Sequence, residues 1–192
     1  MFIQTEATPN PATLKFLPGV VVLNSGTADF RNAEAASEAS PLAARLFEVP
    51  GVTGVFFGYD FVTVTKTGEP DWQHLKPAIL GTIMEHFMSG APVLAPQDEN
   101  SSATADADGE FYDKEDEEIV ITIKELLDTR VRPAVAQDGG DITFRGYENG
   151  TVFLNMKGAC AGCPSSTATL KHGIQNLLRH FVPEVQHVEQ IG

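Results

Sequence analysis

The sequence predicts an α+β protein of two small domains joined by a flexible acidic linker. Strand-like and helix-like patterns occur in two separate regions, and the order of elements differs between them. The charge is also uneven along the 192 residues, whose net charge is -13. Residues 1–88 contain 9 acids and 5 bases, residues 89–118 contain 10 acids and 1 base, and residues 119–192 contain 7 of each.

Residues 1–88 predict the order β-β-α-β-β-α, with helices lying on a mostly antiparallel sheet. Two prolines in Thr8-Pro9-Asn10-Pro11 lack backbone donors and break the first strand pattern into two. A hairpin is expected around Gly58-Tyr59-Asp60. The expected elements are strands at 2–7, 12–17, 52–57 and 61–66, a short helix at 41–48, and a helix with Trp72, Leu75, Ile79, Ile83 and Phe87 at helical spacing.

Residues 89–118 predict a disordered acidic linker. The segment is small, polar and acidic, without apolar periodicity, so it buries too little surface to fold by itself. A flexible chain of about 30 residues has an end-to-end distance on the order of 30 Å. The two domains are therefore expected to move relative to one another.

Residues 119–192 predict the order α-β-β-α-β. The first helix is expected from Ile119, and it either ends near Arg132-Pro133 or continues brokenly to Ala136. The segment 137–141 is read as a helix stop followed by a turn, and Glu148-Asn149-Gly150 as a hairpin turn. The remaining elements are strands with Ile142 and Phe144 and with Val152, Leu154 and Met156, a helix with Leu170, Ile174, Leu177, Leu178 and Phe181, and a strand at 185–191.

Cys160 and Cys163 are the only cysteines, and they lie where a strand gives way to a helix. Two thiolates are half of a tetrahedral sulfur site, so one chain leaves a metal or iron-sulfur centre open unless a second chain supplies the same pair. Pro164 suits the first turn of a helix, whose partial positive charge is expected to favour thiolate over thiol and any anionic cluster bound there. The pair is therefore the predicted metal and cofactor site.

Other uses of a C-x-x-C pair remain open at this stage. A thiol-disulfide oxidoreductase would use Cys160 as nucleophile and Cys163 as resolving thiol, but only 29 residues follow Cys163, too few for a thioredoxin-like fold. A zinc-bridged structural dimer would also need four ligands. His172 and His180 fall toward the polar face of their helix, so they are expected on the surface rather than in the site.

Several classes of protein are not favoured by the sequence. The net charge disfavours nucleic acid and anionic membranes as partners, and no apolar run reaches the length of about 18 residues that spans a bilayer. A Ser/His/Asp set, a P-loop and a dinucleotide fingerprint are missing from the sequence, which predicts no enzyme. The start lacks the layout of a signal or transit peptide, so a bacterial cytoplasmic location is expected.

Three segments resemble one family, the NifU-like (Nfu) iron-sulfur cluster proteins. GACAGCPSSTATLKHGIQ from Gly158 to Gln175, with VRPAVAQDGGDI from Val131 to Ile142, resembles the carboxy-terminal domain of that family. MFIQTEATPNPATLKFLPG at residues 1–19 resembles the amino-terminal domain of its two-domain members. The resemblance covers every part of the chain except the linker.

The resemblance implies a noncatalytic scaffold or carrier that holds a 4Fe-4S cluster between two subunits, with 2Fe-2S as a further form. Cys160 and Cys163 of each chain match the cluster ligands, which implies a homodimer on cluster binding. Upstream cluster assembly proteins and apo iron-sulfur targets are the implied partners, and the amino-terminal domain, which has no cysteine, is expected to recognise them. Larger NifU proteins have further cysteine-bearing regions that this chain lacks, so delivery is favoured over primary assembly.

Overall fold

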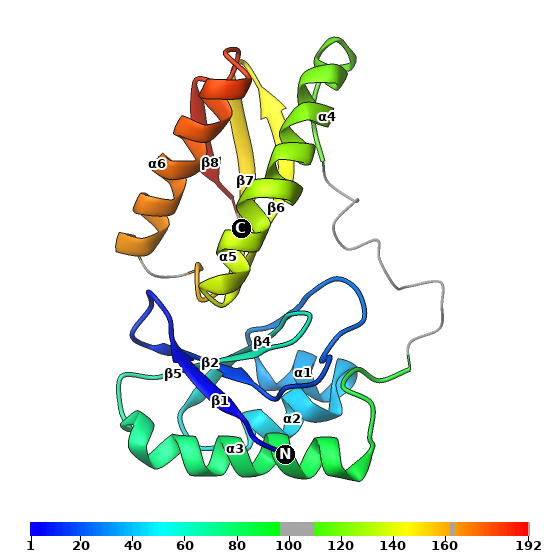
Figure 1. Cartoon of the computed structure of the whole chain (residues 1–192), viewed down its shortest axis with the longest axis vertical. Coiled ribbons are helices and arrows are strands. Elements are labelled where there is room, and N and C mark those ends of the chain that lie inside the picture. The colour runs from blue at the N-terminus through cyan, green and yellow to red at the C-terminus, as the bar shows by residue number, and fades with distance from the viewer. Residues whose placement is uncertain (97–109, 162–163, 192) are drawn as a thin grey trace. The chain divides into compact units, whose positions relative to one another are not determined.

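The computed structural model describes residues 1–96, 110–161 and 164–191. The chain divides into two compact units, Met1–Ser102 and Ala103–Gly192, each with its own hydrophobic core (Figure 1). Both units combine helices with a sheet, which confirms the predicted α+β class. Among the described residues, no helix is both long and apolar enough to cross a membrane.

The first unit has a five-stranded antiparallel sheet in the order β1-β2-β5-β4-β3. Side chains such as Phe16, Phe57 and Val64 on one face of this sheet form a core with three helices, Leu42, Ile79 and Ile83 being fully buried. The elements are β1 (Gln4–Ala7), β2 (Thr13–Leu17), β3 (Ala28–Phe30), α1 (Ala33–Ala39), α2 (Pro41–Phe47), β4 (Val52–Phe57), β5 (Val62–Lys66) and α3 (Trp72–Ser89).

The expected elements of this unit are present, but β3 and α1 are additions to the predicted order. Helix α1 contains alanine as its only apolar residue type, so it lacks the pattern of large side chains that marks a helix in sequence. It forms because the side chain of Asn32 accepts a hydrogen bond from the Ala35 amide and because Ala36 is fully buried. Ser40 ends α1 and caps α2 through the Ala43 amide, at 3.0 Å.

The second unit has the predicted order α-β-β-α-β, preceded by a 3₁₀ turn at Lys114–Asp116. Its first helix continues past Arg132, as the broken alternative expected, through a π-helical segment at Leu127–Val131. The elements are α4 (Glu117–Leu126), α5 (Arg132–Gln137), β6 (Gly140–Glu148), β7 (Thr151–Gly158), α6 (Pro164–Phe181) and β8 (His187–Gln190).

The three strands of this unit lie in the order β6-β7-β8, with β6 and β7 antiparallel and β7 and β8 parallel. A tight turn joins β6 to β7 because Asn149 and Gly150 adopt φ angles of 49° and 78°. Figure 1 shows α4, α5 and α6 beside this sheet. They enclose a core that includes Ile123, Val135, Ile142, Leu154, Ile174 and Leu178.

The structure differs from the predicted linker at both of its ends. Before residue 97, the Ala95 amide donates to the Ala39 carbonyl at 2.8 Å. After residue 109, Phe111 pairs with Gly146 beside β6, and α4 begins at Glu117 rather than at Ile119. The rings of Phe111 and Tyr112 remain partly exposed, but they contact the rings of Phe153 and Phe144 and so attach this end of the segment to the second unit. The middle of the predicted linker, 97–109, lies outside the described residues.

Candidate metal centre

Cys160 lies just after β7 ends, in a tight turn that leads toward α6. Gly158 adopts a φ of 69°, and the Ala161 amide donates to the Gly158 carbonyl at 3.1 Å. Thr167, in the first turns of α6, donates its hydroxyl to the Cys160 carbonyl at 3.0 Å. The Cys160 side chain is 5% exposed and belongs to the core of the second unit. The predicted ligand is therefore held at the edge of a packed core.

A pair of glycines lies against Cys160 from the neighbouring strand. The Ala159 amide donates to the Gly139 carbonyl at 3.1 Å, and Gly139 has a φ of 82° that favours glycine. A Cβ placed on Gly140 would lie 2.8 Å from the Cys160 Sγ and 2.6 Å from the Lys157 carbonyl oxygen. The chain of β6 approaches the sulfur this closely because residue 140 has no side chain.

The surroundings of Cys160 favour the neutral thiol. Burial, together with the smaller effect of the nearby carboxylates of Asp138 and Asp141, raises the pKa of Cys160 to about 12. For Cys160, the raised pKa runs against the sequence-based expectation of a stabilised thiolate, because burial and two acidic neighbours both disfavour the charged form. Binding of a metal at this sulfur must release a proton.

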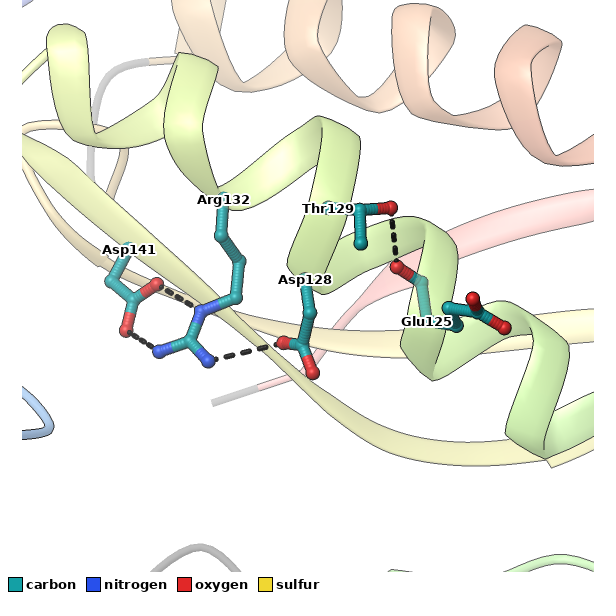
Figure 2. A network of polar contacts seen from close by, with 5 residues as sticks. All are labelled: Glu125, Asp128, Thr129, Arg132 and Asp141. Carbon is teal, nitrogen blue, oxygen red and sulfur yellow. Dashed lines mark hydrogen bonds and ion pairs between the residues drawn. The ribbon is translucent and has the colours of Figure 1, made fainter.

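Arg132, Asp128 and Asp141 form a charged network, and Asp141 directly follows Gly140 in the sequence (Figure 2). Arg132 donates to both carboxylate oxygens of Asp141, from Nε and from Nη2, each at 2.9 Å. Its third nitrogen, Nη1, donates to Asp128 at 3.1 Å. Asp141 is 4% exposed, and its side chain raises the pKa of Arg132. The sequence analysis missed this network, since it read Asp141 only as part of a turn.

The sequence analysis also considered two histidines of α6 as ligands and expected them on the surface. His172 and His180 are exposed, as expected from their helix face. Lys171 forms an ion pair with Glu189 at 2.8 Å. Cys163 lies outside the described residues, so its predicted role stays a prediction. Within the described part of the chain, no group of three or more His, Cys, Asp or Glu side chains could hold a metal ion.

Comparison with known proteins connects both units to one family. Residues 3–90 match the family described as "Scaffold protein Nfu/NifU N terminal", and residues 123–189 match the "NifU-like domain". The whole chain is 54% identical over 192 residues to the NFU1 iron-sulfur cluster scaffold homolog, mitochondrial, of Drosophila sechellia, and it covers 65% of that protein. It is 52% identical to the protein of the same name in Homo sapiens and covers 72% of it.

A solution structure of a NifU-like protein from Saccharomyces cerevisiae is 28% identical to this chain, with a TM-score of 0.46. The match covers 50% of this chain and 87% of the yeast chain.

The predicted bacterial cytoplasmic location is wrong. The matched relatives from flies and humans are mitochondrial proteins, and they point to the mitochondrion instead. The chain spans about 65% of the length of the fly relatives, so its own start says nothing about a preceding segment. From the two family matches and the identity to the human relative, the chain belongs to the Nfu/NifU family of iron-sulfur cluster scaffold proteins.

Proposed function

We propose that this chain is a noncatalytic carrier that holds a 4Fe-4S cluster between two subunits and passes it to apo-proteins. Cys160 and Cys163 of each subunit are the proposed ligands, and the cluster is the cargo. The iron-sulfur scaffold named in the relatives supports the general class. The mitochondrial relatives also favour a mitochondrial site of action.

The position of Cys160 is the observation that carries the proposal. Its sulfur is fixed at the junction of β7 and α6, and thiolate sulfur is the donor that iron-sulfur clusters require. The chain has two cysteines, whereas a 4Fe-4S cluster takes about four thiolates, so two chains are needed to complete the site. Separation of the subunits then dismantles the site and allows release.

The raised pKa of Cys160 fits a carrier better than a permanent holder. Because the pKa of Cys160 is about 12, its thiolate binds a proton readily. Protonation of this sulfur therefore favours release of the cluster. During transfer, thiols of the recipient lose protons and bind iron as thiolates, while the carrier cysteines regain protons and leave. This exchange changes no oxidation state.

The same property counts against the thiol-disulfide oxidoreductase alternative. Such an enzyme attacks a disulfide through a thiolate, and the buried Cys160 is mostly protonated at neutral pH. We therefore expect the iron-free protein to reduce insulin no faster than the Cys160→Ser variant. Reduction that depends on Cys160 would favour the oxidoreductase.

The proposed function is tested by anaerobic reconstitution of the full chain with iron and sulfide. We expect about four irons per dimer, broad visible absorption, and conversion of monomers to dimers by native mass spectrometry. Either Cys160→Ser or Cys163→Ser should abolish the cluster. Binding of iron and sulfide by a monomer without an added thiol would overturn the proposal, and zinc as the bound metal would favour a structural dimer.

A matched control separates the position of the thiols from their number. Ser37 is exposed on α1 in the first unit, so Ser37→Cys restores the count of two cysteines in a Cys163→Ser background. We expect no recovery of the cluster in this double variant. Recovery would show that any second thiol suffices and would contradict the proposed site.

A further inference from the structure

Arg132 connects the start of helix α5 to the start of strand β6 through its side chain. The segment between these two points includes Gly139 and Gly140, which lie close to Cys160. Helix α5 begins at Arg132 and ends at Gln137, two residues follow, and β6 then begins at Gly140. The Arg132 side chain reaches across this segment to Asp141, the second residue of β6 (Figure 2). The loop between α5 and β6 is therefore closed by a side-chain clamp at residues 132 and 141.

The two carboxylates differ in how strongly they hold the Arg132 side chain. Asp141 receives two parallel hydrogen bonds of 2.9 Å, and its side chain is 6% exposed. Asp128 receives a single bond of 3.1 Å, and its side chain is 63% exposed. A paired, partly dehydrated contact resists opening more than a solvated one, so the Asp141 arm is the one that restrains the loop.

The segment closed by the clamp includes Gly140, the residue that lies against the sulfur. Gly140 is the covalent neighbour of Asp141, and it is the residue whose Cβ would lie 2.8 Å from the Cys160 Sγ. The Gly139 carbonyl accepts a hydrogen bond from the amide of Ala159, the residue before Cys160, at 3.1 Å. A shift of Asp141 must therefore move the backbone on which Cys160 packs.

We propose that Arg132 is a positioning residue for Cys160, which acts by clamping Asp141 so that Gly139 and Gly140 stay packed against the thiol. Arg132 also offsets the negative charge of one of the two carboxylates near that thiol. The inference rests on the proposed function for its biological meaning. The contacts that carry it belong to the protein without cargo.

Alkylation of Cys160 tests the inference on the iron-free full chain. In a Cys163→Ser background, Cys160 is the only thiol, so uptake of iodoacetamide at neutral pH reports its accessibility alone. Arg132→Met should raise the alkylation rate about tenfold, because a loosened loop exposes the buried sulfur more often. Arg132→Lys, which keeps the charge but not the fork, should give an intermediate rate.

Two further variants ask whether Arg132 acts through Asp141. Asp141→Asn should raise the rate as Arg132→Met does, and the double variant should be little faster than either single variant. Asp128→Asn should leave the rate within about twofold of the parent, because it removes only the exposed arm. If Arg132→Met fails to fold, Arg132→Lys and Asp141→Asn provide the same comparison.

A control separates positioning from general destabilisation. Lys124→Met breaks the ion pair with Glu110, which lies in the same unit. Urea denaturation gives the stability of each variant, and the Arg132 variants should be alkylated faster than Lys124→Met at matched stability. Equal rates at matched stability, or an unchanged rate in folded Arg132→Met, would overturn the inference. Because no cluster is present, failure of cluster binding in a separate experiment affects only the proposed function.

Discussion

The Sγ of Cys160 packs so closely on Gly140 that only a hydrogen atom fits between the strand and the sulfur. We expect Gly140→Ala to destabilise the second unit by about 1–3 kcal/mol, because the added methyl group meets both the sulfur and the Lys157 carbonyl oxygen. The carbonyl belongs to a paired strand and cannot move freely, so the thiol should be displaced. Urea denaturation measures the first effect, and Cys160 alkylation the second.

Gly173 provides the matched control for this substitution. It lies inside α6, and a Cβ placed there would meet no atom within 4 Å apart from its chain neighbours and the backbone of its own helix. Gly173→Ala should therefore stabilise the helix by about 0.5–1 kcal/mol without changing alkylation. Similar behaviour of the two variants would contradict the close contact at Gly140.

Metal loading should depend on pH through Cys160. Its pKa is raised to about 12, so the thiol is protonated at neutral pH, and each Cys160 that binds a metal releases one proton. Apparent zinc affinity should rise by about tenfold per pH unit for each such cysteine between pH 6.5 and 8.5. Zinc titrations of the iron-free chain at several pH values, at one protein concentration, measure this slope.

Asp138 should set part of that pH dependence. Its carboxylate raises the Cys160 pKa, so Asp138→Asn should lower the pKa and strengthen zinc binding at a given pH. Glu148→Gln removes an equal charge at the opposite, exposed end of β6 and should have little effect. Equal shifts in the two variants would show that only the total charge matters.

His86 should make the first unit less stable in acid. Burial lowers the pKa of His86 below its ordinary value of 6.5, and its Nε2 contacts the Pro92 carbonyl at 3.1 Å. Because the unfolded chain binds the proton more readily, the contribution of His86 to the free energy of unfolding is greatest above pH 6.5. It then falls as the pH drops through 6.5 and levels off below the pKa of the folded state.

The single tryptophan, Trp72, lies in the first unit and reports its unfolding by fluorescence. Urea midpoints should fall between pH 7.5 and pH 5, and His86→Gln should reduce this fall because it removes the buried titrating group. His74→Gln changes an exposed histidine on the same helix and should leave the fall unchanged. A fall that is the same in all three proteins would contradict the assignment to His86.

The turn between β6 and β7 should require glycine at residue 150. Gly150 has a φ of 78°, and a Cβ there would lie 3.0 Å from the Glu184 carbonyl oxygen. Gly150→Ala should cost about 1–2 kcal/mol, since a side chain is strained in the left-handed region. Asn149→Gly should change stability by about 0.5 kcal/mol or less. Hydrogen exchange of the β6 and β7 amides measures both effects.

Sequence patterns predicted the long elements well because large apolar residues repeat on their buried faces. Ile174 and Leu178 mark α6, and Leu154 and Met156 mark β7 in this way. Helix α1 escaped prediction because its buried residue is Ala36, which leaves no large side chain to reveal the period. Strand β3 has three residues, too few for alternation to stand out.

The place of Cys160 in the fold was predictable from the sequence, whereas the electrostatics around it were not. The position of Cys160 between a strand and a helix follows from local patterns, which the structure confirms. Arg132 and Asp141 are nine residues apart, a spacing that is typical of neither a helix nor a strand contact. The clamp between them therefore could not be predicted from the sequence. The raised pKa of Cys160 likewise comes from packing against residues on β6 and the loop before it.

The pairing of Phe111 beside β6 has a practical consequence for dissecting the protein. Phe111 donates to the Arg145 carbonyl and accepts from the Tyr147 amide, while its ring packs on Phe153 with centroids 5.1 Å apart. A fragment that begins at residue 119 would lose the backbone pairing of Phe111 with β6. It would also expose the face of Phe153 that the Phe111 ring covers. Fragments that begin at Glu110 keep Phe111 paired with β6, the edge strand of the sheet. They are therefore better suited to work on the isolated second unit.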